Sequence, residues 1–142
     1  MFEYYNSLPD YLPADDVKKH FQDLLEAFEK RRVGLCDFIK SMYELSDRQW
    51  HTYTLLDPEL KFGIDLVISE ILETKEWKQA DLLICRNTLT IIGNLGLPES
   101  YRMLTSFIVH GLDDEKQQDV KKLEDQVEKF SGGKVVDVYS GL

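Results

Sequence analysis

The densest apolar runs of this chain lie in WKQADLLICRNTLTIIGNLGLPESYRMLTSFIVHGL, residues Trp77–Leu112. The spacing of these apolar residues predicts two helices, over 77–95 and 98–112, joined by a tight turn at Gly93–Pro98. The first of the two is apolar almost all round, which is typical of a helix at the centre of a core. We therefore interpret this stretch as the scaffold of the protein and expect function on neighbouring helices.

Amphipathic patterns on both sides of this stretch predict further helices, so the expected fold class is all-α. Gly34 is predicted to end the first of them as a left-handed cap. Ser46, with Gln49 three residues later, fits a capping box and predicts a helix start. Asp57 followed by Pro58 predicts another. The predicted helices span residues 13–32, 35–45, 46–56, 58–74 and 114–130.

With 142 residues, the chain is long enough for one domain with its own core, residues 1–142. We expect a compact bundle of about six to seven antiparallel helices. Residues 1–12 form an aromatic arm that is expected to pack on the helix over 13–32. Residues 131–142 leave the helical pattern and favour a short extended C-terminal tail.

The central stretch and its flanks resemble a HEAT-like helical repeat. The resemblance implies HEAT-like αα-hairpins in the second half of the chain. The first half, Asp15–Leu45, lacks the glycine pair and the proline turn, so a compact bundle with one or two such hairpins is expected instead of a regular solenoid. The residues that carry the resemblance are Asn87–Gly96, Leu97–Ser100, Leu104, Phe107, Ile108 and Gly111–Asp114.

The formal net charge is −9, which argues against nucleic acids and anionic membranes as ligands. The same charge permits a basic protein partner. No apolar run reaches the length that spans a bilayer, and the N-terminal residues lack the pattern of a signal peptide. A cytoplasmic monomer is the expectation, with Cys36 and Cys85 reduced and buried.

Motifs that carry chemistry are missing from the sequence. His20, His51 and His110 are isolated and belong to no zinc motif. The acidic run Asp113–Glu115 suits a helix start and needs no metal to explain it. We therefore expect no catalytic residue, no metal, no cofactor and no enzymatic activity. An enzyme would require a cleft with perturbed carboxylates or a pairing of Cys36 with a histidine.

The predicted helix over 58–74 carries an acidic and apolar side. Asp65, Ser69 and Glu73 align along it, with Phe62 and Leu66 beside them. Two interpretations are open. The side is either solvated, with both apolar residues covered by a neighbouring helix, or an exposed binding strip.

Acidic and aromatic residues between positions 46 and 77 are the candidates for contact with a partner. Aromatic side chains often dominate the affinity of an interface, and carboxylates pair with arginine and lysine. The candidate partner-binding residues are Tyr53, Asp57, Glu59, Asp65, Glu73, Glu76 and Trp77.

In size, acidity and helix type, the chain is similar to bacterial immunity proteins, the partners of secreted nuclease toxins and of contact-dependent growth inhibition systems. The resemblance implies an inhibitor that occludes the active site of a basic toxin domain. The alternative hypothesis is a helical adaptor, similar to a secretion chaperone, that binds a peptide in a groove between helices.

Overall fold

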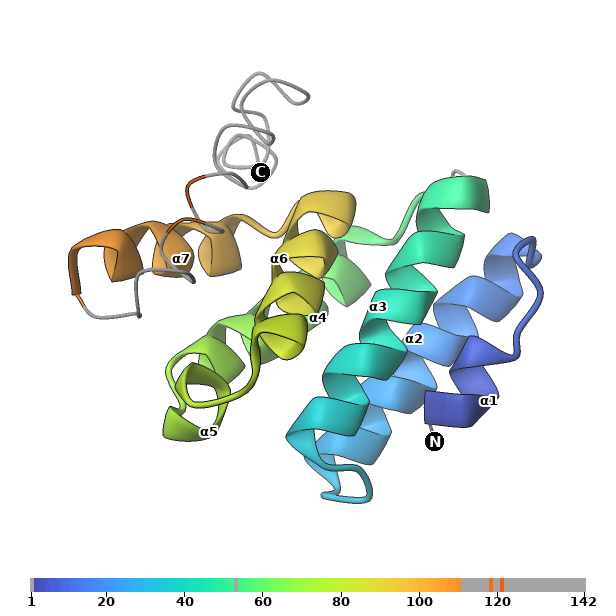
Figure 1. The fold of residues 1–142 in the computed structure, drawn as a ribbon. Coiled ribbons are helices and arrows are strands. Elements are labelled where there is room, and N and C mark those ends of the chain that lie inside the picture. Colours follow the sequence, from blue (N-terminus) through green and yellow to red (C-terminus); the bar gives the residue numbers. More distant parts are fainter. Residues whose placement is uncertain (1, 53, 111–117, 119–120, 122–142) are drawn as a thin grey trace.

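The computed structural model describes residues 2–52, 54–110, 118 and 121. These residues form helices and no strand, which confirms the all-α fold class (Figure 1). The predicted helix over 114–130, the tail over 131–142 and Tyr53 lie outside the described residues. The helices are α1 (Phe2–Asn6), α2 (Ala14–Glu29), α3 (Leu35–Thr52), α4 (Pro58–Leu72), α5 (Lys75–Lys78), α6 (Leu82–Leu95) and α7 (Pro98–His110).

Helix α3 lies between α2 and α6, and α7 packs along α4 (Figure 1). The short link after α2 turns the chain back, so α2 and α3 form an antiparallel hairpin. The core is built by apolar side chains that α2, α3, α4 and α6 bury between them. The largest fully buried side chains include Phe21, Leu24, Phe38, Ile39, Met42, Leu45, Ile64, Ile68, Leu72, Trp77, Ile84 and Ile91.

The HEAT-like pairing of the predicted helices over 77–95 and 98–112 is not confirmed. Helix α7 makes most of its contacts with α4 and few with α6. Gly96 ends α6 in the left-handed conformation with φ 65°, as the predicted turn requires. Pro98 then starts α7 after one intervening residue. This turn leads the chain away from α6 and onto α4.

The predicted break at Ser46 is wrong, because α3 runs without interruption from Leu35 to Thr52. Ser46 is buried, and its hydroxyl donates to the carbonyl oxygen of Tyr43 at 2.9 Å. A serine whose hydroxyl is satisfied by the preceding turn is compatible with a helix interior. The capping-box pattern is therefore present in sequence without acting as a helix start.

The predicted helix over 77–95 is divided into α5 and α6. The hydroxyl of Thr74 accepts from the backbone N–H of Trp77 at 3.2 Å and caps α5. The carboxylate of Asp81 accepts from the N–H of Ile84 at 3.0 Å and caps α6. These two side chains satisfy N–H groups that a helix start leaves unpaired.

The left-handed residue after α2 is Arg31, with φ 58°, and the prediction of Gly34 is wrong. The N–H of Arg32 donates to the carbonyl oxygen of Ala27 at 2.8 Å. The N–H of Arg31 donates to the carbonyl oxygen of Phe28 at 3.0 Å. This pattern is the Schellman motif, whose left-handed position favours glycine. An arginine there is strained by its Cβ.

Replacing Arg31 with glycine is expected to stabilise the protein by about 1 kcal/mol, because glycine adopts positive φ without the Cβ clash. Urea unfolding followed by circular dichroism measures the change. Arg32→Gly is the matched control, since Arg32 does not have positive φ and gains nothing from glycine. Equal stability of the two variants would contradict this account of the α2 terminus.

Candidate protein-binding surface on α4

One side of α4 is open to solvent, and we call it the α4 face. Phe62 and Leu66, one helical turn apart, are 55% and 49% exposed on it. Within the described residues, these exposed fractions contradict the interpretation in which a neighbouring helix covers both side chains. The α4 face contains three carboxylates and no basic side chain. Its residues are Glu59, Phe62, Gly63, Leu66, Ser69, Glu70 and Glu73.

Asp65 lies inside the protein, which corrects its prediction as a partner-binding residue. Its side chain is 1% exposed. One carboxylate oxygen accepts from the N–H of Glu99 at 2.9 Å. The other accepts from the N–H of Ser100 at 2.8 Å and from its hydroxyl at 2.7 Å. Asp65 thus caps the start of α7 from a neighbouring helix and has no surface to offer a partner.

Trp77 is likewise a core residue and not an interface anchor. Its side chain is fully buried, and its indole Nε1–H donates to the hydroxyl of Thr88 at 3.0 Å. A buried indole whose N–H is satisfied is typical of a core tryptophan. The other predicted partner-binding residues that the structure describes are exposed, namely Asp57, Glu59, Glu73 and Glu76.

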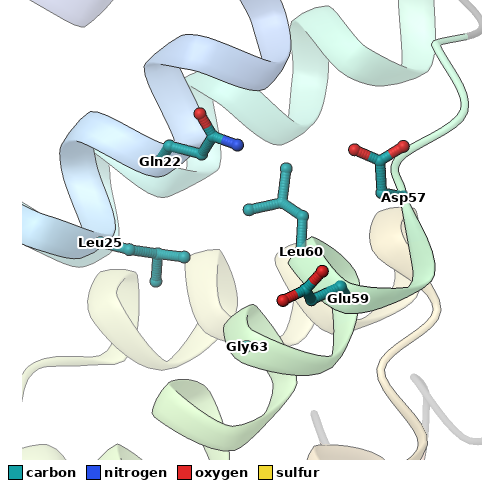
Figure 2. A pocket seen from close by; sticks show the side chains of 6 residues that line it. All are labelled: Gln22, Leu25, Asp57, Glu59, Leu60 and Gly63. Carbon is teal, nitrogen blue, oxygen red and sulfur yellow. The ribbon is translucent and has the colours of Figure 1, made fainter.

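A groove of about 320 Å³ lies between α2 and α4 (Figure 2). Side chains of α2 face side chains of α4 and of the residue before it across this groove. Because Glu59 and Gly63 belong to both surfaces, the groove is continuous with the α4 face. The lining residues are Gln22, Leu25, Asp57, Glu59, Leu60 and Gly63.

Asp57 stands at the N-cap position of α4, yet its side chain makes no capping hydrogen bond. One of its carboxylate oxygens lies 3.6 Å from Nζ of Lys18 on α2. Both side chains are substantially exposed, so this ion pair adds little to stability. The carboxylate of Asp57 is therefore available to a cation from outside.

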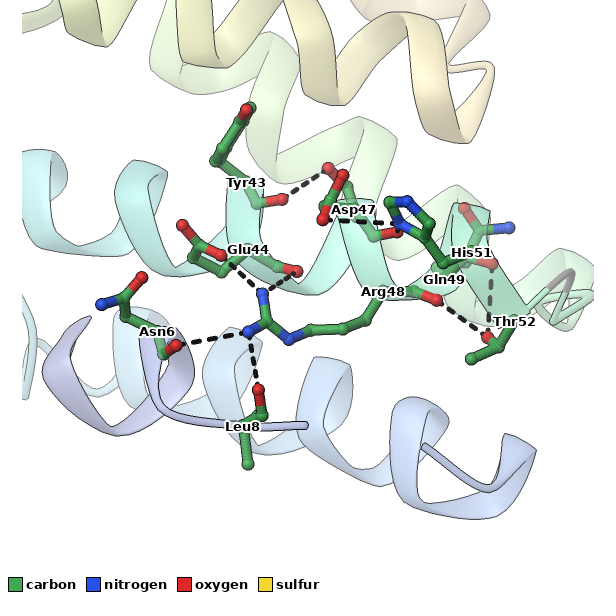
Figure 3. Close-up of polar contacts among 10 residues, drawn as sticks. Asn6, Leu8, Tyr43, Glu44, Asp47, Arg48, Gln49, His51 and Thr52 are labelled. Atoms are coloured by element: carbon green, nitrogen blue, oxygen red, sulfur yellow. Dashed lines mark hydrogen bonds and ion pairs between the residues drawn. The ribbon is translucent and has the colours of Figure 1, made fainter. Parts of the chain in front are cut away.

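The buried cation Arg48 is structural (Figure 3). One terminal nitrogen donates to the carbonyl oxygens of Leu8 at 2.7 Å and Asn6 at 3.3 Å. The other pairs with the carboxylate of Glu44. Through these bonds α3 holds the N-terminal arm, and α1 packs mainly on α3. The arm was expected on α2, which it contacts where Tyr4 and Tyr5 lie against His20.

The shifted pKa values of two other groups have local causes. Burial lowers the pKa of Lys61, and the charge of Asp65 opposes that shift. A hydrogen bond from Lys30 is the main cause of the lowered pKa of the exposed Glu26. Cys36 is exposed, contrary to its predicted burial, whereas Cys85 is buried as predicted.

Within the described part of the chain, no group of three or more histidine, cysteine or acidic residues has the arrangement of a metal site. In the same part, no helix combines the length and apolarity needed to cross a membrane.

No protein-family model, curated protein or solved structure matches the chain. Its class is therefore defined by the fold and the surface. It is an all-α protein that presents a carboxylate-flanked apolar helix face beside a small acidic groove.

Proposed function

We propose that this protein binds a basic toxin domain and neutralises it by covering its active site with the α4 face. The observation that carries the proposal is the pair Phe62 and Leu66, half-exposed between the carboxylates of Glu59, Glu70 and Glu73. Apolar side chains surrounded by polar ones are the usual anatomy of a protein–protein interface. The role corresponds to that of an immunity protein, and a nuclease is the partner class that its charge suits best.

The two components of the α4 face have different effects on binding. Burial of Phe62 and Leu66 supplies affinity, because desolvated apolar anchors dominate most interfaces. The carboxylates attract a basic surface and disfavour acidic ones. A nuclease cleft is basic because it must bind phosphates. An acidic inhibitor therefore competes directly with the substrate for that cleft.

The groove between α2 and α4 favours a second candidate function. A helical adaptor would hold a disordered basic peptide there without needing the rest of the α4 face. The two functions differ in their ligand. An inhibitor binds a folded basic domain far more tightly than any short segment of it, whereas an adaptor binds the segment equally well.

The test is co-expression of this protein with the product of the neighbouring reading frame. We expect a one-to-one complex with a basic domain that persists in size-exclusion chromatography, and loss of that domain's toxicity and catalytic activity. A neighbouring product that is basic and toxic, but is neither bound nor inhibited, would contradict the proposal.

Association with the basic domain is expected to slow about tenfold or more between about 50 mM and about 500 mM NaCl, with little change in dissociation. Salt screens the attraction between the carboxylates and the basic surface. Stopped-flow mixing measures both rate constants. The double variant Glu70→Gln/Glu73→Gln should show a shallower salt dependence. A wild-type association rate that salt leaves unchanged would rule out electrostatic steering by this face.

A further inference from the structure

We propose that the groove between α2 and α4 is an anchor pocket for one arginine side chain of the partner, and that Lys18 is the resident cation this arginine displaces. The inference rests on the proposed function, since it identifies a specific contact made by the basic partner. It is carried by the size of the groove, by its lining and by the position of Asp57.

The size and walls of the groove suit a single long side chain. Its volume of about 320 Å³ is at the lower end of the range of ligand pockets. Leu25 and Leu60 provide apolar walls from the two helices (Figure 2). Gly63 leaves one side open, because nothing lies within 4 Å of the place where its Cβ would stand. The methylene stem of an arginine packs on such walls while its charged end stays in water.

The polar groups of the lining suit a guanidinium. Asp57 and Glu59 contribute carboxylates, and the side-chain amide of Gln22 lies on the opposite helix (Figure 2). A guanidinium has five N–H donors in a planar fork and can bond several acceptors at once. The ammonium of lysine is a compact, strongly hydrated charge, so it gains less from two carboxylates at separate positions.

Lys18 already places a cation beside Asp57. The carboxylate of Asp57 is not used to cap α4, although it occupies the N-cap position. Because the Lys18–Asp57 pair is exposed and weak, an incoming guanidinium displaces the lysine at small cost. Lys18 therefore acts as a competitor within the protein, and its removal should strengthen arginine binding.

The experiment is an NMR titration of the ¹⁵N-labelled full chain with N-acetyl-arginine methylamide. We expect shifts in the backbone amides of Gln22, Asp57, Glu59 and Gly63, and weak saturable binding. The uncharged citrulline analogue should cause none, and the lysine analogue should bind more weakly. Lys18→Gln should tighten arginine binding about threefold, because it removes a weak exposed ion pair. Gly63→Leu should abolish it by filling the groove.

Several results would contradict the proposal that the groove binds an arginine side chain. They are equal shifts with arginine and citrulline, tighter binding of the lysine analogue, and weaker arginine binding after Lys18→Gln. Thermal melts of both variants verify that they are folded. If Gly63→Leu left binding of the basic domain unchanged while Phe62→Ala weakened it as expected, the pocket would fail and the proposed function would stand. A different result would support the pocket and overturn the proposed function. In that case arginine binds as expected, but a basic and toxic product of the neighbouring reading frame is neither bound nor inhibited.

Discussion

Replacing Asp65 with alanine is expected to destabilise the protein by about 3 kcal/mol. The change removes the acceptor for the N–H groups of Glu99 and Ser100 and for the Ser100 hydroxyl. The site is buried, so water does not replace the carboxylate, and buried donors without a partner are costly. The same carboxylate lies at the positive end of the α7 dipole. Its loss frees the start of α7 from α4.

Urea unfolding of Asp65→Ala and Asp65→Asn tests this prediction. The asparagine variant keeps one acceptor oxygen, so it should lose less stability than the alanine variant. Glu70→Ala, an exposed change on the same helix, should lie within about 0.5 kcal/mol of the wild type. If Asp65→Ala also lay within that range, the capping role of Asp65 would be refuted.

Replacing Phe62 with alanine is expected to weaken binding of the basic domain about 30-fold, the effect of losing one interface anchor worth about 2 kcal/mol. Its effect on stability should be small, because the side chain is already half-exposed in the free protein. Calorimetric titration of the purified domain gives the dissociation constant. The stability of each variant is measured in parallel, so that misfolding is distinguished from loss of contact.

Leu83→Ala is the matched control for this prediction. Leu83 is 56% exposed, as apolar as Leu66, and belongs to α6 outside the α4 face. We expect Leu83→Ala to change the dissociation constant less than twofold. If the two substitutions weakened binding equally, the contact surface would not be specific to α4.

Fold class and several helix starts were predictable because their signals are local. Pro58 and Pro98 begin α4 and α7 where the sequence indicated, since proline at the first turn needs no tertiary partner. The predictions at Ser46 and Gly34 were wrong because the local sequence pattern did not decide the structure at these positions. The hydroxyl of Ser46 bonds backward within α3, and the chain places Arg31 in the left-handed position three residues before Gly34.

The acidic residues of the candidate binding surface were predictable, but which of the neighbouring residues are buried was not. Asp57 and Glu59 are exposed, as predicted, because charged side chains usually remain in water. Asp65 is an exception, and its partners are 34 and 35 residues away. The groove depends on α2 lying against α4, which periodicity does not reveal. Gly63 inside a helix was its one local signal.

Photo-crosslinking tests the central claim, that the α4 face contacts the basic domain, most directly. The photoreactive residue p-benzoylphenylalanine is placed at position 66 on α4 or at position 83 on α6, and the complex is irradiated. The account predicts a crosslink to the basic domain from position 66 and none from position 83. A crosslink from position 83 alone would contradict it.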